Sequence, residues 1–317
     1  MRFLATFFTL SALALTACSG ETTATDDTTM MDQEPTQMAD ETTPQASDSA
    51  IEGAASNPTL TAVLDSQPDE VKARYAARHP QETLSFFGIE PGMTVVEALP
   101  GGGWYSKILM GYLGADGRLT GANYAIDLWP LFGSYSAERV KKLETWPTDW
   151  PETAASWGNA DAASVDAFMF GNVPETKLGT ADAVLFVRAL HNLARFESEG
   201  GFLTEAVANA YDVLKPGGVL GVVQHSAPDT ASDEWASGSR GYLKEALVVA
   251  TMEAAGFELV GGSDINANPA DQPGADDIVW RLPPSLSGSK ENPEQAAAMQ
   301  AIGESNRMTL KFVKPMS

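Results

Sequence analysis

The sequence has few cysteines, few basic residues and none of the common metal-ligand spacings, which argues against disulfides, a metal centre and a nucleic-acid-binding face. Its 317 residues contain one cysteine, Cys18, so an intramolecular disulfide is impossible. The metal-ligand spacings His-x-x-x-His and Glu-x-x-His are also missing, and we therefore expect no metal ion. Basic residues are few: 20 Lys and Arg stand against 42 Asp and Glu, a formal net charge of −22. Because nucleic-acid-binding proteins usually present a basic face, we expect no nucleic-acid partner.

The apolar stretch of residues 3–17 is too short to cross a bilayer comfortably as a helix, which takes about 20 residues. It follows Arg2 and ends in Leu-Thr-Ala-Cys at Cys18, which resembles the lipobox of bacterial lipoproteins. The resemblance implies that residues 1–17 are a signal peptide and that a lipid on Cys18 anchors the protein to a membrane of the bacterial cell envelope. Ser19 after the cysteine implies the outer membrane, on its periplasmic side. The alternative is an ordinary secretory signal with an incidental cysteine.

Residues 19–58 contain no Lys, Arg or aromatic side chain and carry nine acidic ones. Such a segment cannot bury enough apolar surface to offset its ordering entropy, and its like charges keep it extended. We predict a disordered acidic tether over residues 18–58. One folded domain with an N-terminal helical extension then occupies residues 59–317, a length ample for a large core.

Short apolar runs alternate with helical patterns through the rest of the chain. We expect strands at 94–98, 117–124, 165–170, 182–187 with a continuation into 188–192, 219–225, 257–260 and 308–313. We expect helices at 59–87, with breaks near Pro68 and at His79-Pro80, and at 104–113, 136–145, 200–214 and 242–255. This alternation predicts a doubly wound α/β domain. Ligands of such domains bind beyond the carboxyl ends of the strands.

Residues 95–106 (Val-Val-Glu-Ala-Leu-Pro-Gly-Gly-Gly-Trp-Tyr-Ser) have the pattern of a buried strand, a glycine loop and the first turn of a helix. The glycines allow the backbone to approach a ligand, and the helix N-terminus offers free N–H groups. Glu97 lies near the loop and is able to accept hydrogen bonds from a ribose or an amino group. The pattern predicts a site for a nucleotide-like ligand.

These elements together resemble a class I S-adenosylmethionine-dependent methyltransferase. Glu97 matches the acid of the first motif, Gly101 and Gly103 match its later glycines, and Leu99 replaces its first glycine. Leu-Lys-Pro-Gly-Gly at 214–218 precedes a strand, as in that family. The resemblance implies a mostly parallel seven-stranded sheet with an antiparallel C-terminal hairpin. It also implies S-adenosylmethionine as the cofactor and methyl transfer to a small molecule as the activity. More narrowly, the loop resembles that of a bacterial group of predicted methyltransferases, many of them exported.

The resemblance further implies which residues bind the cofactor: Glu97, Gly101, Gly102, Gly103, Asn123, Asp161 and Arg188. Asn123 stands where the family usually has an acid that grips the ribose, and an amide binds a diol less well than a carboxylate. Asp127 is a nearby substitute. Asp161 is the candidate for the adenine amino group. Arg188 would hold a carboxylate of the cofactor or of an acidic substrate, or else pair with Glu97 or Asp182.

Methyl transfer mainly requires that two reactants be positioned and that the nucleophile lose a proton. The chain has three histidines, and we expect His191 to end the fourth strand and His225 the fifth. Either is a candidate catalytic base, since neutral imidazole accepts protons near pH 7; the alternative is a structural, hydrogen-bonded histidine. An exported protein meets little S-adenosylmethionine, which is made in the cytoplasm. The rival hypothesis is therefore an envelope-localised, non-catalytic binding or scaffold protein that reuses the fold.

Overall fold

The computed structural model describes residues 58–316. The segments predicted as signal peptide and tether, with Cys18, lie outside the described residues, apart from residue 58. The helices of the N-terminal half are α1 (Pro58–Ser66), α2 (Asp69–Lys72), α3 (Tyr75–Arg78), α4 (Pro80–Phe87), α5 (Trp104–Leu113), α6 (Ala137–Leu143) and α7 (Trp146–Ala155). Those that follow are α8 (Leu190–Arg195), α9 (Glu197–Gly200), α10 (Phe202–Val213), α11 (Glu245–Ala254) and α12 (Pro293–Ile302). Short 3-10 helices are η1 (Ile126–Phe132), η2 (Glu175–Lys177) and η3 (Val279–Arg281).

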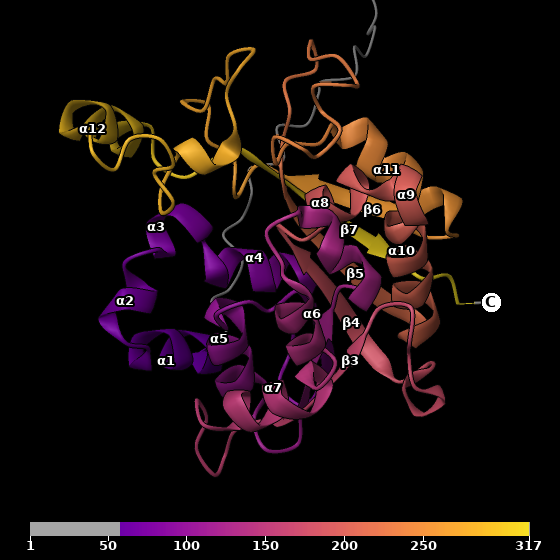
Figure 1. Cartoon of the computed structure of the whole chain (residues 1–317). Coiled ribbons are helices and arrows are strands. Elements are labelled where there is room, and N and C mark those ends of the chain that lie inside the picture. The colour runs from indigo at the N-terminus through magenta and orange to yellow at the C-terminus, as the bar shows by residue number, and fades with distance from the viewer. Residues whose placement is uncertain (1–57, 317) are drawn as a thin grey trace, which may run out of the picture. The chain divides into compact units, whose positions relative to one another are not determined.

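Seven strands form one sheet in the order β3-β2-β1-β4-β5-β7-β6 (Figure 1). They are β1 (Thr94–Ala98), β2 (Arg118–Asn123), β3 (Ser164–Met169), β4 (Ala181–Val187), β5 (Leu214–His225), β6 (Glu258–Ser263) and β7 (Arg307–Val313). Neighbours from β3 to β5 pair in parallel, and β7 runs antiparallel to both β5 and β6. The predicted doubly wound, mostly parallel sheet with an antiparallel C-terminal hairpin is confirmed.

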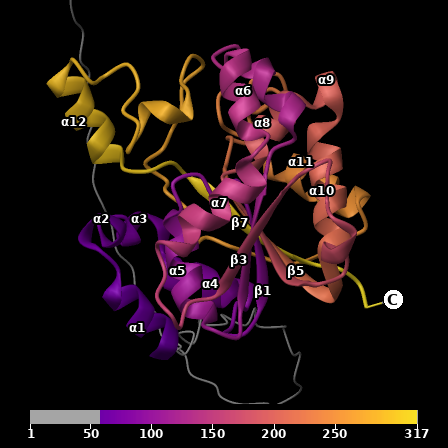
Figure 2. The ribbon, with the colours of Figure 1, turned by 60° about the horizontal axis from the view of Figure 1, so that its bottom comes forward.

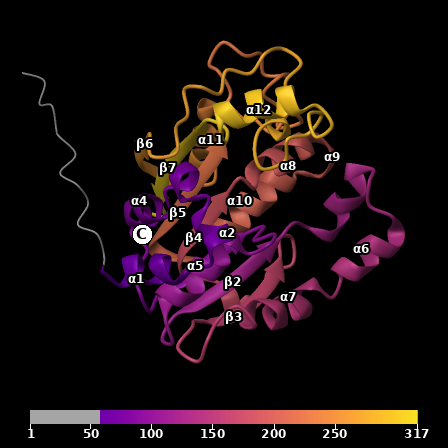
Figure 3. The ribbon, with the colours of Figure 1, turned by 90° about the vertical axis from the view of Figure 1, so that its left-hand side faces the viewer.

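Helices cover both faces of this sheet because successive strand residues point to opposite sides. In β1, Val95 belongs to a buried cluster that includes side chains of α1, α4, α5 and α7, whereas Val96 belongs to one that includes side chains of α8, α10 and α11. Figure 2 shows α4 and α5 on one side of the strands and α10 and α11 on the other. Figure 3 shows α7 beside β2 and β3, which it contacts.

The helices before β1 have the expected breaks at Pro68 and Pro80 and one more between α2 and α3, which makes four short helices, α1 to α4. Proline disfavours helical geometry in the residue before it, and His79 before Pro80 has a left-handed φ of 41°. The structure corrects the expectation that the fourth strand continues through residues 188–192, because α8 begins at Leu190. His191 therefore lies on the first turn of α8 and not at a strand end.

Within residues 58–316, no helix is long and apolar enough to cross a membrane.

Candidate functional site

A cleft of about 440 Å³ lies at the carboxyl ends of β1, β4 and β5. It is lined by Arg74, Arg78, Leu99, Pro100, Gly101, Gly102, Trp104, Val187, Arg188, His191, Asn192, His225 and Trp280. The walls thus come from the N-terminal helices, the glycine loop, the segment after β4, the end of β5 and η3. The topology brings these groups together because the carboxyl ends of parallel strands share one edge of the sheet.

The glycine loop turns sharply between β1 and α5. Leu99, Gly101 and Gly103 have positive φ angles of 50°, 55° and 75°. A Cβ atom on Gly103 would lie 2.2 Å from a ring carbon of Trp157, so only glycine fits there. Gly102 has no such constraint: its φ is ordinary and a Cβ there would meet nothing within 4 Å. Because Gly102 lines the cleft, a side chain at this position would enter the space of a ligand.

Glu97, near the end of β1, affects the site through the position of the glycine loop. It is 4 % exposed, does not line the cleft, and accepts a hydrogen bond of 2.6 Å from the Ser106 hydroxyl on α5. Burial raises the pKa of Glu97 to about 8, against the opposing effect of the Ser106 hydrogen bond. The carboxyl is therefore mostly protonated at pH 7, and it ties the end of β1 to the first turns of α5.

Asn123, at the end of β2, is buried, and its side-chain oxygen accepts a hydrogen bond of 2.9 Å from the Tyr124 N–H. Tyr124 is buried as well and donates its hydroxyl hydrogen to the backbone oxygen of Ala189. Since β1 lies between β2 and β4, this side chain connects the segments on either side of β1. The amide of Asn123 thus shapes the backbone and does not line the cleft.

A second hollow of about 490 Å³ lies at the ends of β2 and β3, and Asp127 lines it. The other residues that line this second hollow are Ala125, Ile126, Leu143, Glu144, Pro147, Met169, Phe170, Gly171, Asn172 and Glu205. Asp161 joins neither cavity: it is exposed and precedes β3, at the opposite edge of the sheet. The family resemblance implied that Asp161 lies near the cofactor. In the structure Asp161 lies at the amino end of β3, whereas the carboxyl end, which belongs to the ligand-binding edge of the sheet, is at Met169.

The two cleft histidines face each other, with ring centroids 5.6 Å apart. Burial lowers the pKa of His191 to about 4, with Arg188 and Arg195 adding to the effect and the Gln224 side chain opposing it. Burial, followed by the charges of His191 and Arg188, also holds the pKa of His225 well below its usual value. Both rings are therefore neutral at pH 7.

Their hydrogen bonds distinguish the two rings. His225 Nδ1 lies 2.5 Å from the Ser305 hydroxyl, whereas His191 Nδ1 is buried without a hydrogen-bond partner among the described residues. His79, the third histidine, does not line the cleft; it lies between α3 and α4.

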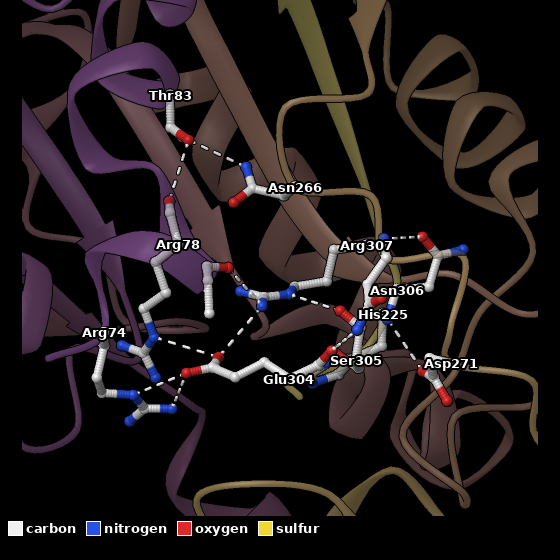
Figure 4. A network of polar contacts seen from close by, with 12 residues as sticks. Arg74, Arg78, Thr83, His225, Asn266, Asp271, Glu304, Ser305, Asn306 and Arg307 are labelled. Carbon is white, nitrogen blue, oxygen red and sulfur yellow. Dashed lines mark hydrogen bonds and ion pairs between the residues drawn. The ribbon is translucent and has the colours of Figure 1, made fainter. Parts of the chain in front are cut away.

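Three arginines, Arg74, Arg78 and Arg307, contact one carboxylate, that of Glu304 (Figure 4), and Arg188 is close enough to feel its charge. Arg74 donates to Glu304 Oε1 at 2.8 and 2.5 Å, and Arg78 and Arg307 approach Oε2 to 3.4 and 3.2 Å. Arg188 has no ion pair within residues 58–316, and Asp182 instead pairs with Lys215. The sequence offered no local signal for Glu304 and Arg307, because they reach the site only through the C-terminal hairpin.

Burial lowers the pKa of Arg78 to about 9 and that of Arg188 to about 10, and neighbouring arginines add to both effects. No group of three or more potential metal-ligating side chains of the described part of the chain is placed to hold a metal ion.

No family model matches the chain, and no curated protein matches it. Its fold is similar to that of a SAM-dependent methyltransferase from Aquifex aeolicus, with 15 % identity and a TM-score of 0.43 over 78 % of this chain and 98 % of that one. An arsenic(III) S-adenosylmethionine methyltransferase from Chlamydomonas reinhardtii has 14 % identity and a TM-score of 0.45, over 82 % and 74 %.

A third similar structure is the 1,6-didemethyltoxoflavin-N1-methyltransferase of Burkholderia thailandensis, with bound 1,6-didemethyltoxoflavin and S-adenosylhomocysteine. It has 13 % identity and a TM-score of 0.40, over 80 % of this chain and 88 % of that one. At identities this low the similarity concerns the fold and assigns no activity to the chain.

Proposed function

We propose that the protein is an S-adenosylmethionine-dependent methyltransferase that acts on a small molecule. The observation that carries this proposal is the composition of one cleft. A glycine loop leads from β1 into the N-terminus of α5, an arginine without an ion pair among the described residues follows β4, and two neutral histidines lie together beside them. This combination supplies a backbone surface for a ligand, a charge for a carboxylate and a proton acceptor.

The residues present fit the cofactor in two respects. The open space above Gly102 leaves room for a ligand against the loop, and Arg188 Nε is a buried donor without a partner in the described part of the chain. We assign Arg188 to the amino-acid carboxylate of the cofactor, and Asp127 in the second hollow to its nucleoside end. Glu97 serves the site indirectly, by fixing the loop through Ser106. When bound, S-adenosylmethionine supplies an electrophilic methyl group.

His191 is the better candidate for the proton acceptor. Its Nδ1 is buried without a partner among the described residues, whereas His225 Nδ1 is engaged by Ser305. A pKa of about 4 makes His191 a weak base towards a free alcohol or amine. A hydroxyl oxygen becomes strongly acidic as it gains a methyl group, however, and a weak base then suffices. His191 orients the nucleophile and takes its proton late, and His225 with Ser305 fixes the neighbouring wall.

Isothermal titration with S-adenosylmethionine tests the proposal. We expect saturable binding to the wild-type protein and its loss in Gly102→Leu, whose side chain would occupy the cleft without straining the backbone. Gly261→Leu on β6 is the matched control, since a Cβ there meets only Phe86 ring atoms near 4 Å and the cleft is unaffected. No binding of millimolar S-adenosylmethionine to the wild type would overturn the proposal and favour the non-catalytic scaffold.

We also propose that the protein is lipid-anchored in the cell envelope through Cys18. The support is the sequence pattern of residues 2–18. Fractionation of cells that produce Cys18→Ser tests this: the wild type should sediment with membranes and the variant should not. Equal sedimentation of both proteins would contradict an anchor at this residue.

A further inference from the structure

The strongest unexplained feature of the cleft is its charge. The chain carries a net charge of −22, yet among the described residues Arg74, Arg78 and Arg307 contact one carboxylate here, Glu304, and Arg188 lies near enough to feel its charge. The carboxyl of Glu97 does not offset the excess, because it is mostly protonated at pH 7. The histidines add no charge. The cleft therefore holds more positive than negative charge, inside an acidic protein.

The described residues supply neither the negative charge nor all the hydrogen-bond acceptors that these arginines require. Arg78 is only 2 % exposed. Its Nη1 atom and the Nε atom of Arg188 are buried without a hydrogen-bond partner among these residues. A buried cation that lacks a full set of partners destabilises the fold. Neighbouring arginines raise this cost further, as the lowered pKa values of Arg78 and Arg188 indicate. An anionic ligand would supply the missing acceptors and charge.

We propose that the arginines on the Glu304 side of the cleft, Arg74 and Arg78, bind a carboxylate or phosphate group of the small-molecule substrate. The inference rests on the proposed function and names the substrate class: an anionic small molecule. A guanidinium group suits this task because its planar fork matches the oxygens of a carboxylate or a phosphate.

The position of the cluster assigns the anion to the substrate and not to the cofactor. Glu304 directly precedes Ser305, whose hydroxyl lies against His225, and Arg307 follows two residues later, so the cluster adjoins His225 (Figure 4). Along the sheet, β7 and β5 lie on the far side of β4 from β2 and β3, where the second hollow offers room for a nucleoside. The anion site and the nucleoside site are therefore on opposite sides of the glycine loop.

Glu304 positions the arginines. Its carboxylate contacts Arg74, Arg78 and Arg307, and Arg307 also donates to the backbone oxygens of Ala77 and Ser305. Arg78 stacks over the ring of Trp104 at 4.5 Å, which fixes its guanidinium plane at the cleft wall. These contacts hold Arg78 in place and leave its Nη1 atom for a ligand.

Isothermal titration with inorganic phosphate and with succinate, at constant ionic strength and with the protein saturated with S-adenosylhomocysteine, tests the inference. We expect saturable binding of at least one of these anions. Arg74→Gln and Arg78→Gln should each weaken it by about tenfold or more, equivalent to about 1.4 kcal/mol. Arg78→Lys keeps the charge and should restore part of the affinity.

Arg118→Gln is the matched control, because Arg118 pairs with Asp166 at the start of β2, away from the cleft, and it should bind the anions like the wild type. Because Arg78 is buried, the folding of Arg78→Gln is checked by circular dichroism. If Arg78→Gln unfolds, the result for Arg74→Gln decides, because the native Arg74 side chain is 23 % exposed.

Three results would overturn the inference: no anion binding to the wild type, unchanged binding in Arg74→Gln, or a loss of S-adenosylhomocysteine affinity in step with the loss of phosphate affinity. The last result would assign these arginines to the cofactor. If S-adenosylhomocysteine fails to bind the wild type, the proposed function fails separately. Anions titrated into the ligand-free protein then decide the anion site: binding lost in Arg74→Gln supports it, and no binding refutes it.

Discussion

The hydroxyl of Tyr124 donates a hydrogen bond of 2.6 Å to the backbone oxygen of Ala189. Tyr124 follows β2 and Ala189 follows β4, so one buried side chain connects the two strands that flank β1 at the functional edge of the sheet. Ala189 lies between Arg188 and Leu190, where α8 begins. This bond therefore fixes the backbone that carries both Arg188 and His191 into the cleft.

Replacement of Tyr124 by Phe should lower the free energy of unfolding by about 1–3 kcal/mol, because the buried Ala189 oxygen loses its donor while the ring packing stays. Urea denaturation followed by tryptophan fluorescence measures the change. Tyr135→Phe is the control: Tyr135 contacts Trp129 of the same aromatic cluster with tilted rings but is only partly buried, and the expected change is near zero. Equal stabilities of Tyr124→Phe and wild type would contradict the role given to this bond.

Glu97 makes the stability depend on pH in a defined direction. Its pKa is about 8 in the folded protein and near 4.5 when unfolded, so between these values the folded state holds a proton that the unfolded state has lost. The free energy of unfolding therefore falls as pH rises through this range, by about 1.4 kcal/mol per pH unit from this group. Below pH 4.5 the contribution vanishes, and above pH 8 the penalty is complete.

Glu97→Gln removes the titration and keeps a side chain able to accept the Ser106 hydrogen bond. We expect it to match the wild type near pH 4.5 and to be more stable at pH 8, by a margin that grows with pH between them. Chemical denaturation of both proteins at several pH values provides the test. A constant difference across this range would show that the carboxyl does not titrate as described.

His191 acts in the opposite sense. Its pKa is about 4 in the folded protein, so below pH 6.5 the unfolded state takes up a proton that the folded state rejects. Stability is lost as pH falls from 6.5 towards 4, by about 1.4 kcal/mol per pH unit from this residue. His191→Gln should show a shallower loss than the wild type over this interval, measured by thermal denaturation. Parallel curves for the two proteins would mean that His191 is not buried in its neutral form.

Leu99 has a left-handed φ of 50° and lines the cleft. In such a conformation a side chain costs on the order of 1 kcal/mol, which glycine avoids. This strain affects the free energy of unfolding and not the affinity. Leu99→Gly should bind S-adenosylmethionine more tightly than the wild type because it frees space beside the loop. Leu99→Ala should fall between them because it frees less space. Weaker binding by Leu99→Gly, measured by isothermal titration, would show that the Leu99 side chain contributes to the ligand site.

The strands of the sheet and most of its helices were predictable, because buried runs such as 182–187 and the glycine loop at 101–103 are local patterns. The convergence of the loop, Arg188 and the two histidines was predictable as well, since parallel strands place their carboxyl ends together. The helical start of α8 was missed because Arg188 to Asn192 continue an apolar strand without a proline or glycine to mark its end.

The contribution of Glu304 and Arg307 to the cleft was not predictable. They lie more than 200 residues from Arg74 and Arg78 along the chain, and only the pairing of β7 with β5 brings them together. Distances along the sequence carry no information of this kind. Asp161 is a different case: it precedes the strand expected at 165–170, and the amino end of that strand lies at the opposite edge of the sheet from the cleft.

We propose that the cleft over the glycine loop holds the cofactor, and a crystal structure of the protein grown with saturating S-adenosylhomocysteine is the decisive test. We expect ligand density against the loop at Gly101 and Gly102, with the amino-acid carboxylate within hydrogen-bonding distance of Arg188 and the nucleoside towards Asp127. Ligand bound elsewhere on the protein, or a cleft without ligand under these conditions, would contradict it.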